Sequence, residues 1–521
     1  MEDNKASQTM ENVSQEQIVK NRNFFQCRYF VALMGFFTFA IFNVQVISTS
    51  VSIVAMVNNS KIKSLTNSTT NDKVSCVMNI GNTTKDLQHE SKGEFDWDPQ
   101  IQGYVLGAAN LGFVITHMPG GLLAEMAGAK ITLLSGILIA SVAHVVSPFA
   151  AWAGSYYMIA VLLLRGLGHG VLPPSNFVLA ANWIPRHERG MVMTFICSGI
   201  CVGAIVGGMA SGALCASDFL AGWPSVYYIF GSLGILLSLC YALFVYNSPS
   251  QHPRITDSER MYIIENQETD LSKKRPFTPW RAILTSVPFY AMVAGVFGNF
   301  WAAGHFLSVH PTFLGTILHF SIQENGLFSS VPFALQTVFT LLSSWMSDWL
   351  IRNDIVGLSK VRKGFNMLGC LGYSLSVFGI FMVGCDKMLS TVFSILAIGC
   401  GGFGNAGVMI NAMDLSPTFI GSLVGLGSIG STSALYIVPV VVGHLTKNEQ
   451  TLEQWNKMFF ISIAVVMTSG IIFCVFGSAE VQPWNFPPEE NNKKKTNENG
   501  VMHKVYAYEN PNYVPYFTTH L

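Results

Sequence analysis

Two side chains in one long apolar segment could do chemistry. Arg165 and His169 lie four residues apart, which places both on one face of a helix. A guanidinium is always charged and can bind an anion, whereas an imidazole titrates near neutral pH. A charge inside an apolar segment is costly, so it should face a polar cavity or a partner. We expect Arg165 to anchor an anion and His169 to carry a proton. The alternatives are a structural arginine near a helix end and a hydrogen-bonded histidine of the core.

Further polar residues lie in two other apolar segments. Asn43 and Gln45 are in the first segment, and Asn299, Trp301 and His305 are in the seventh. Amides offer both donors and acceptors, and every polar group within an apolar segment needs a partner. We expect these five side chains to line a binding site for a small solute, although neighbouring helices could satisfy them without one.

These residues belong to a chain that is too apolar for a soluble domain. Of its 521 residues, 50% are hydrophobic and 12% are charged, against about 25% charged in soluble domains. Twelve apolar runs are long enough to cross a hydrocarbon layer of ~30 Å. They lie at 29–57, 101–123, 130–152, 156–182, 191–215, 223–246, 287–314, 326–349, 364–384, 390–412, 418–443 and 455–478. The sequence therefore predicts an all-α integral membrane protein.

Polar segments divide the runs into two sets of six. The N-terminal half covers 29–246 and the C-terminal half 287–478, with a charged segment at 247–286 between them and polar tails at 1–28 and 479–521. Such a division indicates a parallel repeat. The first tail has no apolar core with a cleavage site, so it is not a signal peptide. Lys and Arg concentrate in the first tail and in alternate loops, which predicts that both termini are cytoplasmic.

The first loop, residues 58–100, lies on the opposite side of the membrane in this orientation. Its three N-x-[ST] sequons, at Asn58, Asn67 and Asn82, predict a glycoprotein. The ten cysteines show no metal-binding spacing. Cys76 in this loop could form a disulfide with Cys215 or Cys385.

Turns in both halves carry charged residues at matching places. The second and third runs are joined by Gly121-Leu-Leu-Ala-Glu125-Met-Ala-Gly128-Ala-Lys130, and Asp348 holds the place of Glu125 in the second half. Gly121 would permit close helix contact, and Glu125 could pair with a cation or a helix N-terminus across the bundle. We expect these residues to gate the molecule, together with Asp414 at the end of the tenth run.

The turn and further motifs resemble the anion:cation symporter family of the major facilitator superfamily. That family includes vesicular glutamate transporters, sialin and sodium/phosphate cotransporters. The motifs include Phe95-Asp-Trp97-Asp-Pro99, Trp183-Ile-Pro185, Gly222-Trp223-Pro224, Thr256-Asp-Ser-Glu259-Arg260-Met-Tyr262 and Asp414-Leu-Ser-Pro417. The resemblance covers about residues 25 to 485. It implies a twelve-helix major facilitator fold and a secondary active symporter of inorganic phosphate or small organic anions that works by alternating access.

The resemblance also implies buried charges around a central cavity, and this sequence departs from it there. The family's arginine, histidine and acid positions fall on Val46, Leu106, Leu162, His169 and Asn299. Arg165, one turn from Leu162, is the candidate replacement. The substitutions leave two alternatives open: a transporter of a neutral or cationic solute, and a sensor or scaffold that does not transport.

Other functions lack support in the sequence. It contains no G-x-x-x-x-G-K-[ST] loop and no metal or nucleophile constellation, so we expect no enzyme and no cofactor apart from sodium or a proton as coupling ion. Zero net charge offers no basic excess for nucleic acid. The expected partners are a small-molecule solute, membrane lipid and an endocytic adaptor at Asn510-Pro511-Asn512-Tyr513. The expected location is the plasma membrane or a lysosomal or vesicular membrane.

Overall fold

The computed structural model describes residues 26–58, 93–185, 188–266, 278–416, 419–447 and 450–485. Within these ranges, twelve helical spans are long and apolar enough to cross a membrane. The predicted fold class is confirmed. The sequons Asn67 and Asn82, the thiol of Cys76 and the adaptor motif at 510–513 lie outside the described residues.

The first six spans form the N-terminal half. They are α2 (Cys27–Met56), α4 (Pro99–Met126), α5 (Ala129–Ala153), α6 with α7 (Ser155–Gly170 and Leu172–Trp183), α8 (Arg189–Cys215) and α9 (Trp223–Phe244). The fourth span is divided because Pro173 and Pro174 lack backbone N–H donors and can occupy only the first turn of a new helix. Arg165 and His169 lie in the turns before this division.

The C-terminal half repeats this plan with two irregular spans. Its helices are α12 (Val287–Gly304), α13 (His310–Thr316), α14 (Ile322–Arg352), α15 (Leu358–Val383), α16 (Lys387–Gly404), α17 (Asn411–Leu415), α18 (Ile420–Leu445) and α19 (Leu452–Phe476). One π-turn, η5 (His305–Val309), joins α12 to α13, and another, η6 (Asn405–Met409), precedes α17. Single π-turns inside α-helices frequently mark functional sites.

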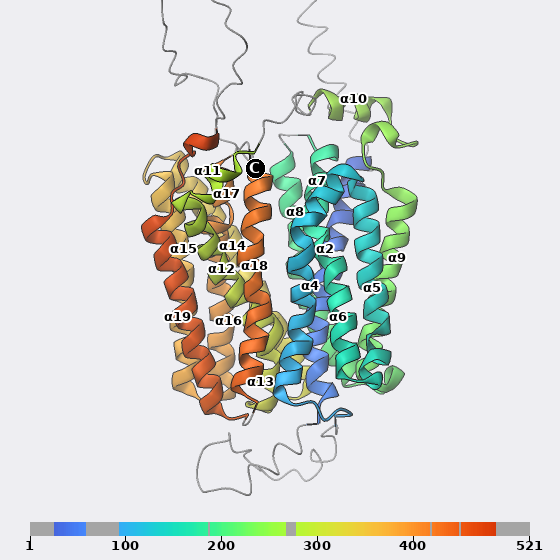
Figure 1. Ribbon diagram of the computed structural model, residues 1–521, viewed down its shortest axis with the longest axis vertical. Helices are drawn as coiled ribbons and strands as arrows, with labels where there is room; N and C mark the ends of the chain where they lie inside the picture. The colour runs from blue at the N-terminus through green and yellow to red at the C-terminus, as the bar shows by residue number, and fades with distance from the viewer. Residues whose placement is uncertain are drawn as a thin grey trace, which may run out of the picture.

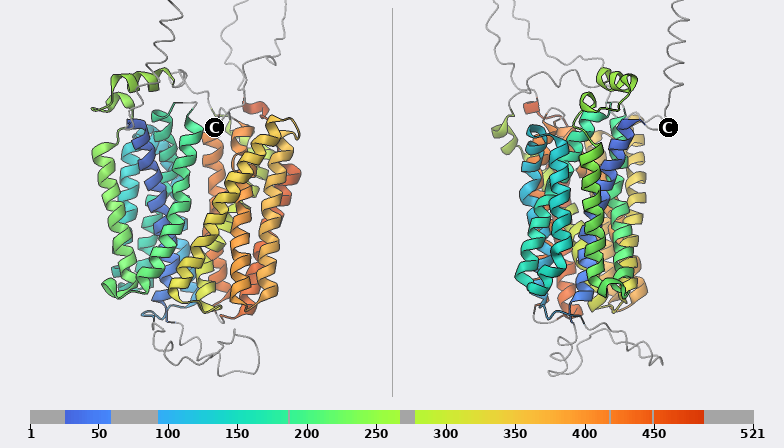
Figure 2. Two further views of the ribbon diagram at one scale, coloured as in Figure 1. Left: turned by 180° about the vertical axis from the view of Figure 1, so that it is seen from behind. Right: turned by 90° about the vertical axis from the view of Figure 1, so that its right-hand side faces the viewer.

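The two halves stand side by side with their helices roughly parallel (Figures 1 and 2). The central segment contains α10 (Asp257–Glu265) and α11 (Trp280–Leu284), both at the upper end in Figure 1, which we call the α10 end. The opposite end, where α13 lies, is called the α13 end. We call the surface between the halves the seam. There α4 packs on α18, and α8 packs on α14.

Contacts across the seam gather toward the α13 end. Glycines let the backbones meet: a β-carbon at Gly103 would lie 2.5 Å from the carbonyl oxygen of Pro439, and one at Gly326 would lie 2.5 Å from that of Gly208. Side-chain hydrogen bonds also join the halves from α4 to α18. The deepest of them runs from Asn110 to the carbonyl of Leu435 at 2.9 Å. The halves are therefore closed against each other at the α13 end.

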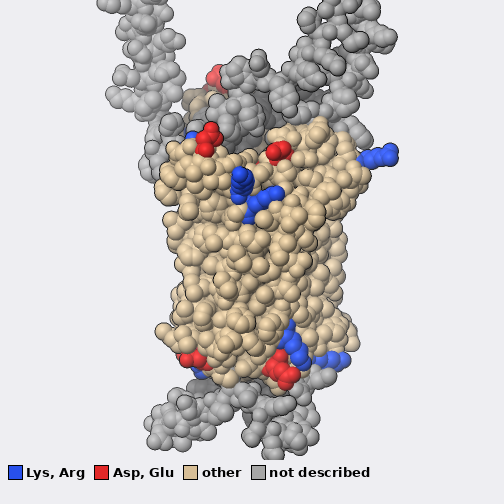
Figure 3. All heavy atoms as spheres, turned by 90° about the vertical axis from the view of Figure 1, so that its left-hand side faces the viewer, with Lys and Arg blue, Asp and Glu red and all other residues tan. Residues whose placement is uncertain are grey.

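The outer faces of the helices suit a lipid environment. Large apolar side chains are exposed there, including Phe149 at 58%, Trp345 at 65% and Val475 at 62%. Figure 3 shows that Lys, Arg, Asp and Glu on one face gather toward the two ends and leave an uncharged band between them. Such a band is the surface that a bilayer requires.

The cysteines correct one expectation. Cys385, at the turn before α16, is disulfide-bonded, whereas Cys215 is a free thiol. Cys215 lies 3.8 Å from the Ser52 hydroxyl and is only partly buried. The option of a Cys76–Cys215 disulfide was therefore wrong.

Candidate functional site

Arg165 lies in the interior of the N-terminal half. It is about 15 Å from the start of α6 at 1.5 Å per residue, which is near the middle of a bilayer core. One guanidinium nitrogen directs its two N–H groups at three acceptors: the carbonyl of Gln45 at 3.1 Å, the hydroxyl of Thr49, and Nδ1 of His144 at 3.2 Å. The residue is only 2% exposed. These bonds tie α6 to α2 and α5.

The charge of Arg165 has no carboxylate partner among the described residues. All its hydrogen-bond partners are neutral, and its Nε is buried with no acceptor. Because Nδ1 of His144 accepts from Arg165, the His144 proton must sit on Nε2, which is also buried without a partner. The cluster therefore has surplus N–H donors and a full positive charge, which is the chemistry that attracts an anion.

Gln45 links His169 to this cluster. Nε2 of His169 lies 2.9 Å from the Gln45 side-chain oxygen, and the Gln45 amide donates to Ser141 at 3.2 Å. Since that oxygen can only accept, His169 carries its proton on Nε2. The rings of Phe42 and His169 meet edge to face, 4.9 Å apart. The prediction that Arg165 and His169 share one helix face agrees with this geometry, in which both residues bond Gln45.

The other predicted site residues have partners elsewhere. Asn43 donates to the carbonyl of Ile200 at 2.7 Å. Asn299 donates to the carbonyl of Gly295 and to Asn366, Trp301 donates to Ser462, and His305 bonds Tyr373. The last three residues thus bond within the C-terminal half, and the structure does not bring them to the Arg165 cluster. A solute contact for them stays a prediction.

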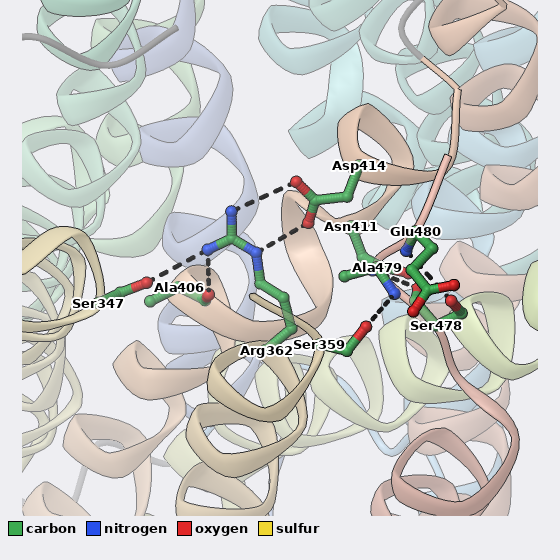
Figure 4. Close-up of polar contacts among 9 residues, drawn as sticks. All are labelled: Ser347, Ser359, Arg362, Ala406, Asn411, Asp414, Ser478, Ala479 and Glu480. Carbon is green, nitrogen blue, oxygen red and sulfur yellow. Dashed lines mark hydrogen bonds and ion pairs between the residues drawn. The ribbon is translucent and has the colours of Figure 1, made fainter. Parts of the chain in front are cut away.

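The predicted gating residue Asp414 belongs to a buried ion pair at the α10 end. Figure 4 shows its carboxylate facing Arg362, whose Nε donates at 2.8 Å. The same guanidinium donates to Ser347 at 3.3 Å and to the carbonyl of Ala406 at 3.0 Å. These bonds join the ends of α14, α15 and α17, with Asp348 of α14 within electrostatic range. Arg362 was not among the predicted site residues, since nothing local in the sequence points to a partner 52 residues away.

The matching turn in the N-terminal half is organised by Gly128. It has a φ of +96°, which favours glycine, and the following helix begins with the N–H of Lys130 donating to Asn247 at 2.8 Å. The ammonium of Lys130 lies 4.5 Å from the Tyr246 ring centre. Gly121 was expected to permit close helix contact, but Gly120 does so: its β-carbon would lie 2.7 Å from Val171, whereas one at Gly121 would have ordinary contacts. Glu125 is exposed at this end.

Helix α10 holds the first span at this end. The carboxylate of Glu259 accepts the backbone N–H groups of Cys27 at 3.1 Å and Arg28 at 3.0 Å, where α2 begins. The Arg28 side chain lies 3.3 Å from Glu188 and 4.6 Å from the Tyr262 ring centre. Burial raises the pKa of the Tyr262 phenol, so the phenol keeps its proton and donates it to Glu188 at 3.0 Å.

Replacing Glu259 with glutamine is expected to lower the free energy of unfolding by about 1 kcal/mol, because a negative charge at a helix N-terminus is lost. Thermal unfolding of the purified protein would measure this loss. Glu265→Gln is the matched control, since Glu265 is exposed at the end of the same helix. Equal unfolding temperatures for both variants would contradict a capping role.

The chain is similar to known proteins in both sequence and fold. Residues 28–439 match the family model described as Major Facilitator Superfamily. The chain is 33% identical over 473 residues to a Drosophila melanogaster protein named "Putative inorganic phosphate cotransporter", which covers 90% of this chain and 88% of that protein. It is 31% identical to sialin from Homo sapiens over 459 residues, covering 88% and 90%. The inward open conformation of the xylose transporter XylE from E. coli has a TM-score of 0.63 at 12% identity, covering 86% of this chain and 96% of that one.

Proposed function

Since this chain belongs to the major facilitator superfamily and to its anion:cation symporters, it is a membrane transporter, and we propose that its solute is inorganic phosphate or a small organic anion. The observation that carries this proposal is the unpaired charge of Arg165. In the described N-terminal half it is the one full charge near mid-membrane depth, and it has surplus donors beside it. An anion in the seam would offset the cost of burying that charge.

Alternating access between the halves is the mechanism we propose. We infer from the Lys and Arg distribution that the α10 end lies in the cytoplasm, so the closed α13 end would face outward and this state would open to the cytoplasm. In the opposite state the α13 end would separate and the α10 end would close. The coupling ion would be sodium or a proton, in the plasma membrane or a lysosomal or vesicular membrane. The adaptor site at Asn510, Pro511 and Tyr513 and glycosylation at Asn58, Asn67 and Asn82 are part of this proposal.

A neutral solute is the second candidate. Leu106 and Leu162, at positions where the family carries charges, are 8% and 0% exposed and contribute only apolar surface. Arg165 also bonds within its own half, as a structural arginine would. A sensor or scaffold without flux remains the third candidate.

Uptake by the full chain in proteoliposomes would distinguish these candidates. Radiolabelled phosphate, urate, sialic acid, glutamate and a neutral sugar would be supplied under imposed sodium, proton and voltage gradients. We expect saturable uptake of phosphate or an organic anion, competed by other anions. Uptake of the sugar alone would favour the second candidate. Silence across the panel from protein that unfolds cooperatively would favour the third.

A further inference from the structure

We propose that His305 and His310 form the proton-binding site of this transporter, and that the protonated pair keeps the α13 end open unless an anion is bound. The inference rests on the transport cycle proposed above and names the proton as its coupling ion. It concerns the seventh span, where η5 joins α12 to α13 (Figure 1).

One π-turn brings the two imidazoles to the same place. The N–H of His310 donates to the carbonyl of His305, five residues earlier, which is the bond that defines a π-turn. The Phe306 ring lies between the histidines, with its centre 5.0 Å from one and 4.7 Å from the other. Both are buried, with 1% and 2% exposure. At 1.5 Å per residue, His305 lies about as deep in the membrane as Arg165.

The hydrogen bonds of His310 fix the position of its proton. The Ser394 hydroxyl donates its proton to the carbonyl of Ser390 at 2.8 Å. Its oxygen must then accept from Nε2 of His310, which lies 2.9 Å away. Nδ1 of His310 is therefore unprotonated, and it is buried with no donor. A buried ring nitrogen with an unused lone pair is a proton acceptor.

His305 also has one ring nitrogen without a hydrogen-bond partner. Its Nδ1 lies 2.9 Å from the hydroxyl of Tyr373, while its Nε2 is buried with no partner. Tyr373 is the other titratable group in contact with His305, and the Ser462 hydroxyl faces Tyr373. The neighbours from α16 and α19 are Ser394, Phe459 and, beyond Phe313, Trp455. In the part of the chain described here, no carboxylate, lysine or arginine faces either histidine.

The pair lies behind the contact that closes the α13 end. Helix α13 begins at His310 and packs on α2, where a β-carbon at Gly315 would lie 2.5 Å from the Val54 side chain. Ile47 and Val51 of α2 are fully buried in the same apolar cluster as Val309. The same turns of α2 carry Gln45 and Thr49, which bind Arg165. Helix α2 therefore separates the histidine pair from the Arg165 cluster.

The charge balance of this arrangement couples proton to anion. A proton from hydronium would bind the Nδ1 lone pair of His310 and give an imidazolium. Burying that cation without a counter-charge has a high free-energy cost, so protonation favours the conformation in which the α13 end is open. An anion beside α2 would supply the counter-charge and permit closure with both bound. Once the anion leaves toward the α10 end, the imidazolium loses its counter-charge and returns the proton to water there.

Thiol labelling at the seam tests this without measuring transport. Val442→Cys would place a thiol in a small seam pocket beside Leu106 and Thr312, at a position only 6% exposed. Labelling by a membrane-impermeant maleimide in excess of that of the unsubstituted protein, which has free thiols such as Cys215, is divided by the rate for denatured protein at each pH and reports opening of the α13 end. We expect about a tenfold rise from pH 8 to pH 5. Adding phosphate at pH 5 should reverse it.

Two substitutions that keep the observed hydrogen bonds sharpen the test. His305→Asn retains a nitrogen near Nδ1 and His310→Gln retains one near Nε2, but neither titrates. We expect the double variant to give a flat profile. His444 of α18 is another titratable group at this end, since its Nε2 lies 3.2 Å from the Gln100 amide across the seam, and we expect His444→Gln to keep the rise. A flat profile in the Val442→Cys protein alone, or loss of the rise in His444→Gln, would overturn the inference. If the rise occurs but phosphate does not reverse it, the inference stands and the proposed solute is wrong.

Discussion

Replacing Arg165 with glutamine is expected to lower phosphate uptake into proteoliposomes by about 30-fold. Glutamine can still donate toward the carbonyl of Gln45 and the hydroxyl of Thr49, but it carries no charge. Two unit charges about 8 Å apart interact by about 2 kcal/mol at an effective dielectric constant of ~20. That free energy corresponds to about 30-fold in affinity. The loss should therefore appear in the apparent phosphate affinity.

A binding measurement separates this loss from misfolding. Phosphate should raise the unfolding temperature of the unsubstituted protein, because a ligand that binds only the folded state stabilises it. The same concentration should barely shift Arg165→Gln. Arg254→Gln is the matched control, since Arg254 is an exposed arginine of the central segment. Full uptake by Arg165→Gln would show that the arginine is structural and that the anion is held elsewhere.

The spans could be predicted from the sequence because bilayer thickness and hydropathy determine their length. The last was predicted at 455–478 and is observed at Leu452–Phe476. The irregularities within spans were not predicted. The division of the fourth span could have been predicted from Pro173 and Pro174, because proline interrupts the hydrogen bonds of a helix. No local sequence pattern predicts the π-turns at His305 and Asn405, because they depend on how neighbouring helices pack.

The candidate site was predictable only in part. Helical periodicity correctly placed Arg165 and His169 on one face, and both bond to Gln45. Periodicity says nothing about which helix that face meets. The bonds from Arg165 to Thr49 and His144 arise from tertiary packing of three spans. The partners of Trp301 and His305 were unpredictable for the same reason. These two residues bond Ser462 and Tyr373 inside their own half.

Replacing both Gly103 and Gly326 with alanine is expected to open the α13 end and abolish most transport. These glycines lie on α4 and α14, at the starts of the second and eighth spans, so they hold corresponding places in the two halves. Each alanine β-carbon would lie 2.5 Å from a backbone carbonyl oxygen across the seam. Backbone cannot rotate away as a side chain can, so the helices must separate. Overpacking costs typically about 1–3 kcal/mol per site.

That cost applies only to the conformation in which the α13 end is closed. The substitutions would therefore lower the population of this conformation. Two such sites would shift the balance between closed and open α13 ends by about 30-fold or more. Thr312→Cys, in the seam pocket and 8% exposed, would report this as faster labelling by an impermeant maleimide. Gly425→Ala is the matched control, because Gly425 lies on α18, like Gly443 of the seam, and no atom is near its β-carbon position. If the double variant labels no faster than this control and still transports, the close glycine crossings do not form the closed state, and closure must depend on the contact between α13 and α2.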